Sequence, residues 1–201
     1  KGRCYIYKLG VSDNGISVAS TDGCLRLVSC SNAISIKRID LIFRSLFYLD
    51  FPVVWTHIGD GHLIETIKDE LHNLSSNVKV NLLGHLRNSD VINFYTTEPV
   101  DLFINVSLSE GLPVSLMEAF SFGIPAIATD VGGTSEIVNP SNGFLLSAQL
   151  SEELLAETII NYNSLHFEVK EQMRLNARDM WAREYNAEQN FKAFSSFLQK
   201  L

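Results

Sequence analysis

Apolar residues gather in short continuous runs along the chain, and each run is followed by a stretch with helical spacing. The apolar runs occupy residues 24–30, 52–59, 78–84, 100–107, 125–130 and 143–146. The helical stretches that follow them occupy residues 38–49, 62–74, 88–97, 113–122 and 134–138. Continuous rather than alternating apolar strands indicate burial on both faces of a sheet. The pattern therefore predicts an α/β fold, a Rossmann-like doubly wound parallel sheet of about six strands.

The C-terminal part of the chain is helical in pattern. Ser151 precedes two glutamates, which is typical of a helix N-cap followed by acids in the first turn. No internal repeat, low-complexity segment or evident linker interrupts residues 24–201. We therefore expect one α/β domain over residues 24–201 with a helical C-terminal tail. Residues 1–23 would be a lead-in or interdomain segment.

Composition and charge narrow the class of protein. The 201 residues are 46% hydrophobic and 19% charged, as in an ordinary globular protein. A net charge of −7 without a Lys/Arg cluster argues against a nucleic-acid partner. Cys4, Cys24 and Cys30 lack paired spacing, which favours reduced thiols over a metal site or a disulfide framework. With no apolar run long enough to cross a membrane, these features predict a cytoplasmic protein.

The functional residues should lie in the turns that follow the strands. In open α/β sheets, ligands bind outside the carboxyl ends of the strands, near the point where strand order reverses. The turns concerned are Asn32–Lys37, Gly59–Gly61, Gly84–Arg87, Ser107–Ser115 and Asp130–Thr134. Several residues there and elsewhere have a simple structural interpretation. We expect the glycines at 59, 61, 132 and 133 to shape turns, and Trp55 and Trp181 to pack in the core.

The stretch "SLSEGLPVSLMEAF" places Glu110 and Glu118 at the change from strand to helix. Pro113 suits the first position of a helix, and Gly123 followed by Pro125 suits its end. Glu118 would then lie in the second turn, and helical side chains lean toward the helix N-terminus. Its carboxylate is therefore expected to reach the crevice at the end of the strand.

This turn also offers an anion site. The free N–H groups of Leu112, Val114 and Ser115, with the helix dipole behind them, favour a negatively charged ligand. Carboxylates tolerate a nearby anion only where they accept hydrogen bonds from hydroxyl groups. A nucleotide sugar supplies both phosphates and hydroxyls, with Glu118 on the ribose diol and Glu110 on the sugar. The spacing fits equally well two acids that only stabilise a helix start.

The segment "SEGLPVSLMEAFSFGIPAIATDVGGTSEIV" resembles the E-x7-E signature of retaining GT-B glycosyltransferases of family 4, the glycosyl transferases group 1. The form is that common in polysaccharide and capsule biosynthesis. Other parts agree in order and spacing with the C-terminal donor-binding domain of that family, over roughly residues 24–201. They are "LVSCSNAISIKRIDLI", "WTHIGDG", "NVKVNLLGHL" and "MWAREYNAEQNFKAF".

The resemblance implies one half of a two-domain enzyme, with the N-terminal acceptor domain absent from this chain. The full-length protein would transfer a sugar from a nucleotide-diphosphate sugar to a glycan or lipid-linked saccharide, with retention of configuration. The isolated domain is expected to be inactive. A lipid-linked acceptor would bring the full-length protein to the inner face of the membrane, as a peripheral association. The nucleotide sugar is a substrate, and neither a cofactor nor a metal is expected.

The resemblance also implies roles for individual residues. Glu118 would accept hydrogen bonds from the ribose hydroxyls, and Glu110 from hydroxyls of the donor sugar near the reacting carbon. Lys37 would neutralise the diphosphate as it leaves, a main catalytic contribution in a closed site. Backbone groups of His85 and Leu86 would read the base. The remaining donor contacts would be made by Gly111, Leu112, Val114 and Ser115.

Two departures from the family pattern matter. The family usually has an arginine five or six residues before the lysine, where this chain has the neutral Asn32. Either Arg38 supplies the second contact to the diphosphate or the diphosphate is bound more weakly. Pro113 also removes an amide donor that many members have. Two alternatives to a transferase follow: an epimerase of the same fold, whose histidine and acid constellation is not evident, and a non-catalytic nucleotide-sugar binding module.

Overall fold

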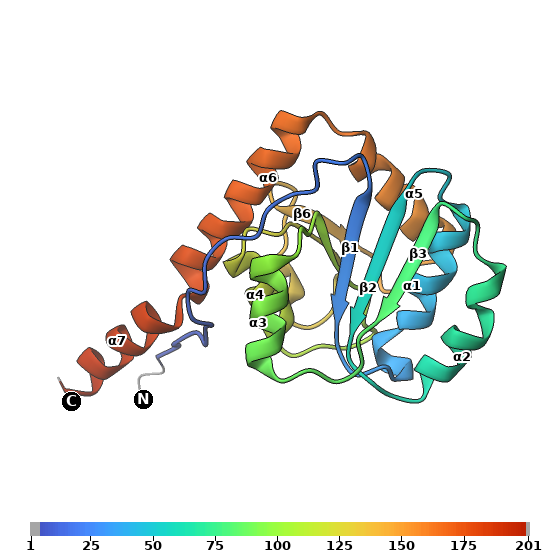
Figure 1. Cartoon of the computed structure of the whole chain (residues 1–201). Helices are drawn as coiled ribbons and strands as arrows, with labels where there is room; N and C mark the ends of the chain where they lie inside the picture. Colours follow the sequence, from blue (N-terminus) through green and yellow to red (C-terminus); the bar gives the residue numbers. More distant parts are fainter. Residues whose placement is uncertain (1–4, 200–201) are drawn as a thin grey trace.

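The computed structural model describes residues 5–199 and contains one parallel sheet with helices on both faces (Figure 1). The strand order is β3-β2-β1-β4-β5-β6, with every neighbouring pair parallel. The strands are β1 (Leu25–Cys30), β2 (Val53–Ile58), β3 (Val78–Leu82), β4 (Leu102–Asn105), β5 (Ala126–Thr129) and β6 (Gly143–Leu146). The doubly wound six-stranded sheet predicted from the apolar runs is therefore confirmed.

The order of the strands creates one crevice in the middle of the sheet. The chain winds outward from β1 to β3, crosses back to β4 beside β1, and winds outward again to β6. Leu27 pairs with Leu102 and Val28 with Phe103 across this central junction. Loops that leave the carboxyl ends of β1 and β4 diverge to opposite faces, which leaves room for a ligand between them.

The helices follow the strands as the spacing predicts, with differences in detail. They are α1 (Ile39–Ser45), α2 (Leu63–Glu70), α3 (Asn88–Thr97), α4 (Val114–Ser121), α5 (Glu152–Ser164), α6 (Phe167–Met180) and α7 (Ala187–Leu198). Short 3-10 turns are η1 (Ser35–Lys37), η2 (Leu46–Tyr48), η3 (Leu71–Asn73) and η4 (Thr134–Glu136), and a π-helical stretch is η5 (Trp181–Tyr185). The helical pattern at 134–138 thus forms a single 3-10 turn.

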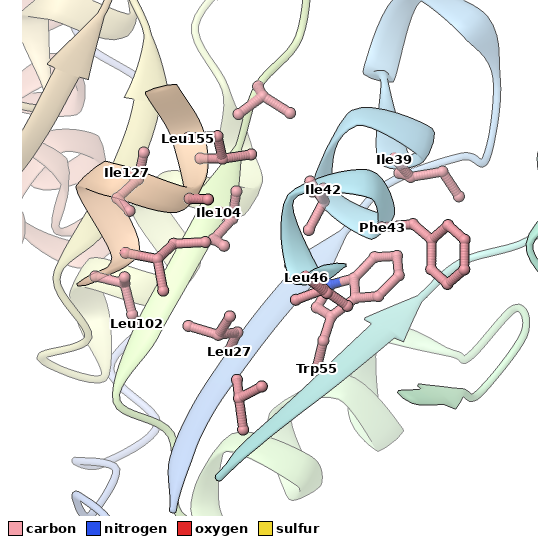
Figure 2. Packing of buried hydrophobic residues seen from close by; sticks show 14 of the residues in the cluster. Leu27, Ile39, Ile42, Phe43, Leu46, Trp55, Leu102, Ile104, Ile127 and Leu155 are labelled. Carbon is pink, nitrogen blue, oxygen red and sulfur yellow. The ribbon is translucent and has the colours of Figure 1, made fainter. Parts of the chain in front are cut away.

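Side chains alternate between two cores, one on each face of the sheet. On β4, Leu102 and Ile104 belong to the core under α1, α2 and α5, whereas Phe103 belongs to the core under α3, α4 and α6. Figure 2 shows the first core, where α1 lies over Trp55 and the neighbouring strands. Trp55 and Trp181 are buried, one in each core, which confirms the packing role expected of both.

Both ends of α4 and the start of α5 lie within a residue of their predicted positions. Ser151 caps α5, because its hydroxyl accepts from the backbone N–H of Leu154 at 3.3 Å. Gly123 ends α4 with a φ of +70°, a conformation that side chains with a Cβ disfavour. Pro113 lies one residue before the helix, as its N-cap, rather than at the first helical position.

The segment before β1 runs along the surface of the domain. The backbone of Val11 bonds to Tyr185 and Ala187 near the C-terminal helices, and Val100 N–H donates to the carbonyl of Val18. Further out, Tyr5 and Tyr7 contact aromatic rings of α7. The first part of this segment and α7 extend together beyond the sheet (Figure 1).

Two glycines allow the loops after β1 and β2 to touch. A Cβ on Gly59 would lie 1.8 Å from the carbonyl oxygen of Ser31, and one on Gly61 would lie 2.5 Å from that of Ala33. The Ala33 N–H in turn donates to the carbonyl of Asp60 at 2.8 Å. The two glycines have the positive φ of a turn, as predicted, and they also allow a close backbone approach that the sequence did not predict.

A polar network lies inside the sheet beneath these loops. Ser29 Oγ accepts from Trp55 Nε1 at 3.0 Å and lies 2.9 Å from His57 Nδ1. Burial lowers the pKa of His57 to about 4.

We expect Gly59→Ala to destabilise the protein more than Gly15→Ala. Both glycines have a positive φ, so alanine is strained by about 1–3 kcal/mol at either position. At position 15 no atom of the described residues lies within 4 Å of the added Cβ, whereas at position 59 the backbone of Ser31 must move. Urea unfolding of both variants measures the difference. Equal losses of stability would show that the close approach imposes no constraint.

Folding stability should fall between pH 6.5 and pH 4 because of His57. The unfolded chain takes up a proton near the ordinary pKa of 6.5, whereas the folded chain resists protonation down to about 4. The free energy of unfolding then decreases with falling pH by about 1.4 kcal/mol per unit from this residue. Urea unfolding at a series of pH values should give a shallower slope for His57→Asn. His72→Asn, which removes an exposed histidine from η3, provides the control.

Candidate functional site

The carboxyl ends of β1 and β4 bring Lys37 and Glu110 together. Lys37 ends the 3-10 turn η1 after β1, and Glu110 lies in the loop between β4 and α4. Lys37 Nζ is 2.6 Å from Glu110 Oε1, and the two side chains are only 24% and 11% exposed. Water and salt screen a partly buried pair less than a surface pair. The two residues predicted to act on the diphosphate and the sugar therefore form one ion pair in the structure.

Glu110 has a second partner that sequence reasoning did not identify. Asn105, the last residue of β4, donates from Nδ2 to Glu110 Oε1 at 3.3 Å. Its Oδ1 accepts from the N–H of Ser107 at 3.3 Å and from the hydroxyl of Ser107 at 2.7 Å. The available signal was a single amide at the end of the otherwise apolar run "LFIN".

A neighbouring loop holds the backbone around Glu110. The N–H of Gly133 donates to the carbonyl of Gly111 at 2.7 Å. Gly132 has a φ of +54°, and a Cβ there would lie 1.9 Å from the carbonyl oxygen of Glu110. The loop after β5 therefore packs against the loop after β4, which confirms the turn-shaping role expected of Gly132 and Gly133.

The first turn of α4 presents unpaired amides. The N–H groups of Leu116 and Met117 bond to the carbonyl of Pro113. Within residues 5–199, no acceptor lies within bonding distance of the amides of Leu112, Val114 and Ser115. These donors and the positive end of the helix dipole favour an anion at this place.

Glu118 lies in the second turn of α4 and faces the start of α3. Its Oε1 accepts from Asn88 Nδ2 at 2.8 Å. Burial raises the pKa of Glu118, and the hydrogen bond from Asn88 partly offsets that rise. His85 and Leu86 precede α3 in the loop after β3, the first exposed and the second half-buried. The residues predicted to read the base therefore lie just before Asn88, at the start of the helix that Glu118 faces.

Arg38 is committed to the backbone of two other loops. Its Nε donates to the carbonyl of Val106 at 2.6 Å and its Nη1 to that of Ala148 at 2.9 Å. The residue has a left-handed backbone with a φ of 50°, and burial lowers the pKa of its guanidinium. Nη2 is buried without a partner among the described residues. Asn32 is exposed in the turn after β1.

A cavity of about 320 Å³ adjoins this edge between α3, α4, α7 and the N-terminal segment, with Asn88 and Glu118 in its wall.

Within residues 5–199, no three His, Cys, Asp or Glu side chains form a group that suits a metal ion. No helix in that range is long and apolar enough to cross a membrane. Cys24 and Cys30 are free thiols, and Cys4 lies outside the described residues.

Solved glycosyltransferases share the fold. The chain is similar to the apo form of the lipopolysaccharide outer core galactosyltransferase WaaB, with a TM-score of 0.79 and 22% identity over 98% of this chain and 56% of that one. It is also similar to Anabaena HepE in complex with UDP and glucose, with a TM-score of 0.72 and 20% identity over 89% of this chain and 49% of that one.

At the level of sequence, the chain is similar to the O-antigen biosynthesis glycosyltransferase WbnH of Escherichia coli, with 36% identity over 89 residues. That match covers 44% of this chain and 24% of the relative. The chain therefore matches about a quarter of this relative and about half of the solved structures. The family model described as glycosyl transferases group 1 matches residues 26–180, most of the domain described above. The chain belongs to the glycosyl transferases group 1 family.

Proposed function

We propose that this chain is the donor-binding half of a retaining glycosyltransferase of family 4, which transfers a sugar from a nucleotide-diphosphate sugar to an acceptor. The observation that carries the proposal is the meeting of three elements at the carboxyl edge of the sheet. These are the Lys37–Glu110 pair, the unpaired amides at the start of α4, and Glu118 in the next turn. Membership of the family supports the same conclusion.

The site is suited to each part of the donor. The amides of Val114 and Ser115, together with Lys37, would bind the diphosphate. Glu118 would accept from the ribose diol while Asn88 orients its carboxylate. Glu110 would accept from a hydroxyl of the sugar, and backbone groups near His85 and Leu86 would contact the base.

Charge stabilisation would be the main contribution of this half to catalysis. When the bond between the anomeric carbon and the phosphate oxygen breaks, negative charge grows on the departing diphosphate. Lys37 and the α4 amides lie where they would stabilise that charge, and their positions are fixed before the reaction begins. The acceptor hydroxyl oxygen would bond to the anomeric carbon from the face that the nucleotide leaves and pass its proton to the departing phosphate oxygen, so the configuration would be retained. Because these groups already supply positive charge, no metal is proposed.

The acceptor and the groups that position it would lie on the N-terminal domain of a longer protein. The chain alone should therefore bind donor but transfer sugar slowly at best, because positioning of the acceptor supplies a large part of the rate. The name of the relative WbnH supports a role in polysaccharide biosynthesis. A lipid-linked acceptor would place the full-length protein at the inner face of the membrane.

One observation favours a second candidate, a non-catalytic nucleotide-sugar binding module. Asn32 is neutral and exposed, and two nitrogens of the Arg38 guanidinium bind backbone carbonyls. Lys37 would then be the principal side-chain cation on the diphosphate. Turnover by the full-length protein distinguishes the two candidates, since a binding module would hold the nucleotide sugar without consuming it.

Calorimetric titration with UDP, GDP and ADP tests the proposed function. We expect one of them to bind, and Lys37→Ala and Glu118→Ala each to weaken it by about 1–3 kcal/mol, the value of a charge-assisted hydrogen bond. Lys68→Ala and Glu65→Ala remove exposed charges on α2 and should leave the affinity unchanged. Absence of binding, or equal losses in the control variants, would contradict a donor site at this edge.

As the pH is lowered, the affinity for a nucleotide sugar should be lost at a higher pH than a glutamate with an ordinary pKa would give. Only the carboxylate form of Glu118 accepts two hydroxyl donors, and burial raises its pKa above the usual 4.5. Affinity is therefore present above that raised pKa and lost as the pH falls through it. In the wild-type protein the hydrogen bond from Asn88 lowers the pKa of Glu118. Asn88→Ala removes that bond and should therefore move the midpoint to a still higher pH.

Titrating UDP-glucose, GDP-mannose or ADP-glucose across this pH range makes the measurement, since the phosphates of these diesters do not titrate there. Glu118→Gln serves as the control and should bind weakly at every pH. A midpoint for the wild-type protein at or below that of an ordinary glutamate would contradict the assignment of Glu118.

A further inference from the structure

Lys37 has two competing partners: Glu110, which it contacts in the structure, and the diphosphate of the proposed donor. In the structure, Lys37 Nζ lies against Glu110 Oε1 at 2.6 Å. If a diphosphate binds, its two negative phosphates attract the same ammonium group. Glu110 would then lose its cation while its side chain remains only 11% exposed. Because an unpaired, mostly buried carboxylate is costly, the fold needs a second group to hold it.

Asn105 has the geometry for this task. Its Nδ2 lies 3.3 Å from the same carboxylate oxygen that Lys37 contacts. The orientation of the amide is defined, because its other end faces the backbone N–H of Ser107, which can only donate. The oxygen of Asn105 must therefore point to Ser107 and its NH2 group to Glu110.

The position of Asn105 is also rigid. It ends β4, a central strand paired on both sides with β1 and β5, and Asn105 itself pairs with Ala128 of β5. The carbonyl of Ser107 accepts from the buried hydroxyl of Thr129, which ties the following turn to β5. A side chain fixed in this way holds its partner with little further loss of entropy.

We propose that Asn105 is a positioning residue: its hydrogen bond holds the Glu110 carboxylate in place when Lys37 pairs with the donor diphosphate. Glu110 then stays aimed at a hydroxyl of the donor sugar instead of turning with Lys37 toward the phosphates. A neutral amide suits this role better than a second cation, because a cation would itself be drawn to the diphosphate. The inference rests on the proposed function.

The test compares each nucleoside diphosphate with its sugar ester in calorimetry: UDP with UDP-glucose, GDP with GDP-mannose, and ADP with ADP-glucose. In Asn105→Ala, the affinity for the sugar ester should fall roughly tenfold, the loss of one hydrogen bond to a charged group. The affinity for the matching nucleoside diphosphate should change less than about twofold, because that ligand lacks the sugar. Asn81→Ala, which removes an amide on β3 bonded to Thr56, should leave both affinities unchanged.

A second variant separates positioning of Glu110 from a role in shaping the loop. Asn105→Asp keeps an oxygen for Ser107 but presents a second oxygen, not a donor, to Glu110. It should therefore lose affinity for the sugar ester at least as strongly as Asn105→Ala, and regain part of it at lower pH, where a carboxyl of the pair is protonated.

The outcomes distinguish this inference from the proposed function. If the wild-type protein binds none of the three pairs, the proposed function fails and the inference with it. If the wild type binds but Asn105→Asp behaves like wild type, or both members of a pair weaken equally in Asn105→Ala, only the inference is overturned. Either of these last two results would show that Asn105 stabilises the turn at Ser107 and does not position Glu110.

Discussion

Parallel pairing of β1 with β4 brings Lys37 and Glu110 within 2.6 Å although 73 positions separate them in the chain. Neither residue is near the other until the strands between them have wound outward and the chain has returned to the centre of the sheet. Helices bury both faces of the sheet, and their crossovers place strands that follow one another in the chain side by side on each half. The site is therefore a consequence of the sheet topology, and the loops after β1, β2, β4 and β5 add the close contacts that make it definite.

Those contacts are made mainly by backbone. Gly59 and Gly61 let the loop after β2 touch the loop after β1, and Gly132 lets the loop after β5 touch Glu110. Arg38 ties the turn that carries Lys37 to two carbonyls on the loops after β4 and β6. These backbone contacts therefore fix the loops that carry Lys37 and Glu110 before a ligand binds. Preorganisation of this kind is what electrostatic stabilisation of a leaving group requires.

Much of this architecture could be predicted from the sequence because its signals are local. Apolar runs, Ser151 and Gly123 each act through neighbouring residues, and the strands and helix ends follow them closely. The partners of Arg38 and Asn105 could not be predicted, because they depend on loops brought together by tertiary packing. For the same reason the spacing of Glu110 and Glu118 did not show that one would face Lys37 and the other Asn88.

The proposed function requires a nucleotide sugar to bind at the carboxyl edge between β1 and β4. Amide NMR spectra of this 22.5 kDa chain, recorded during titration with nucleotide, test it directly because they report position as well as affinity. If the donor binds there, the largest changes are expected at Gly111, Leu112, Val114 and Ser115. Changes confined to the opposite end of the sheet, around the cavity lined by Asp101 and Lys170, would contradict it, as would a spectrum that does not respond to any of the nucleotides.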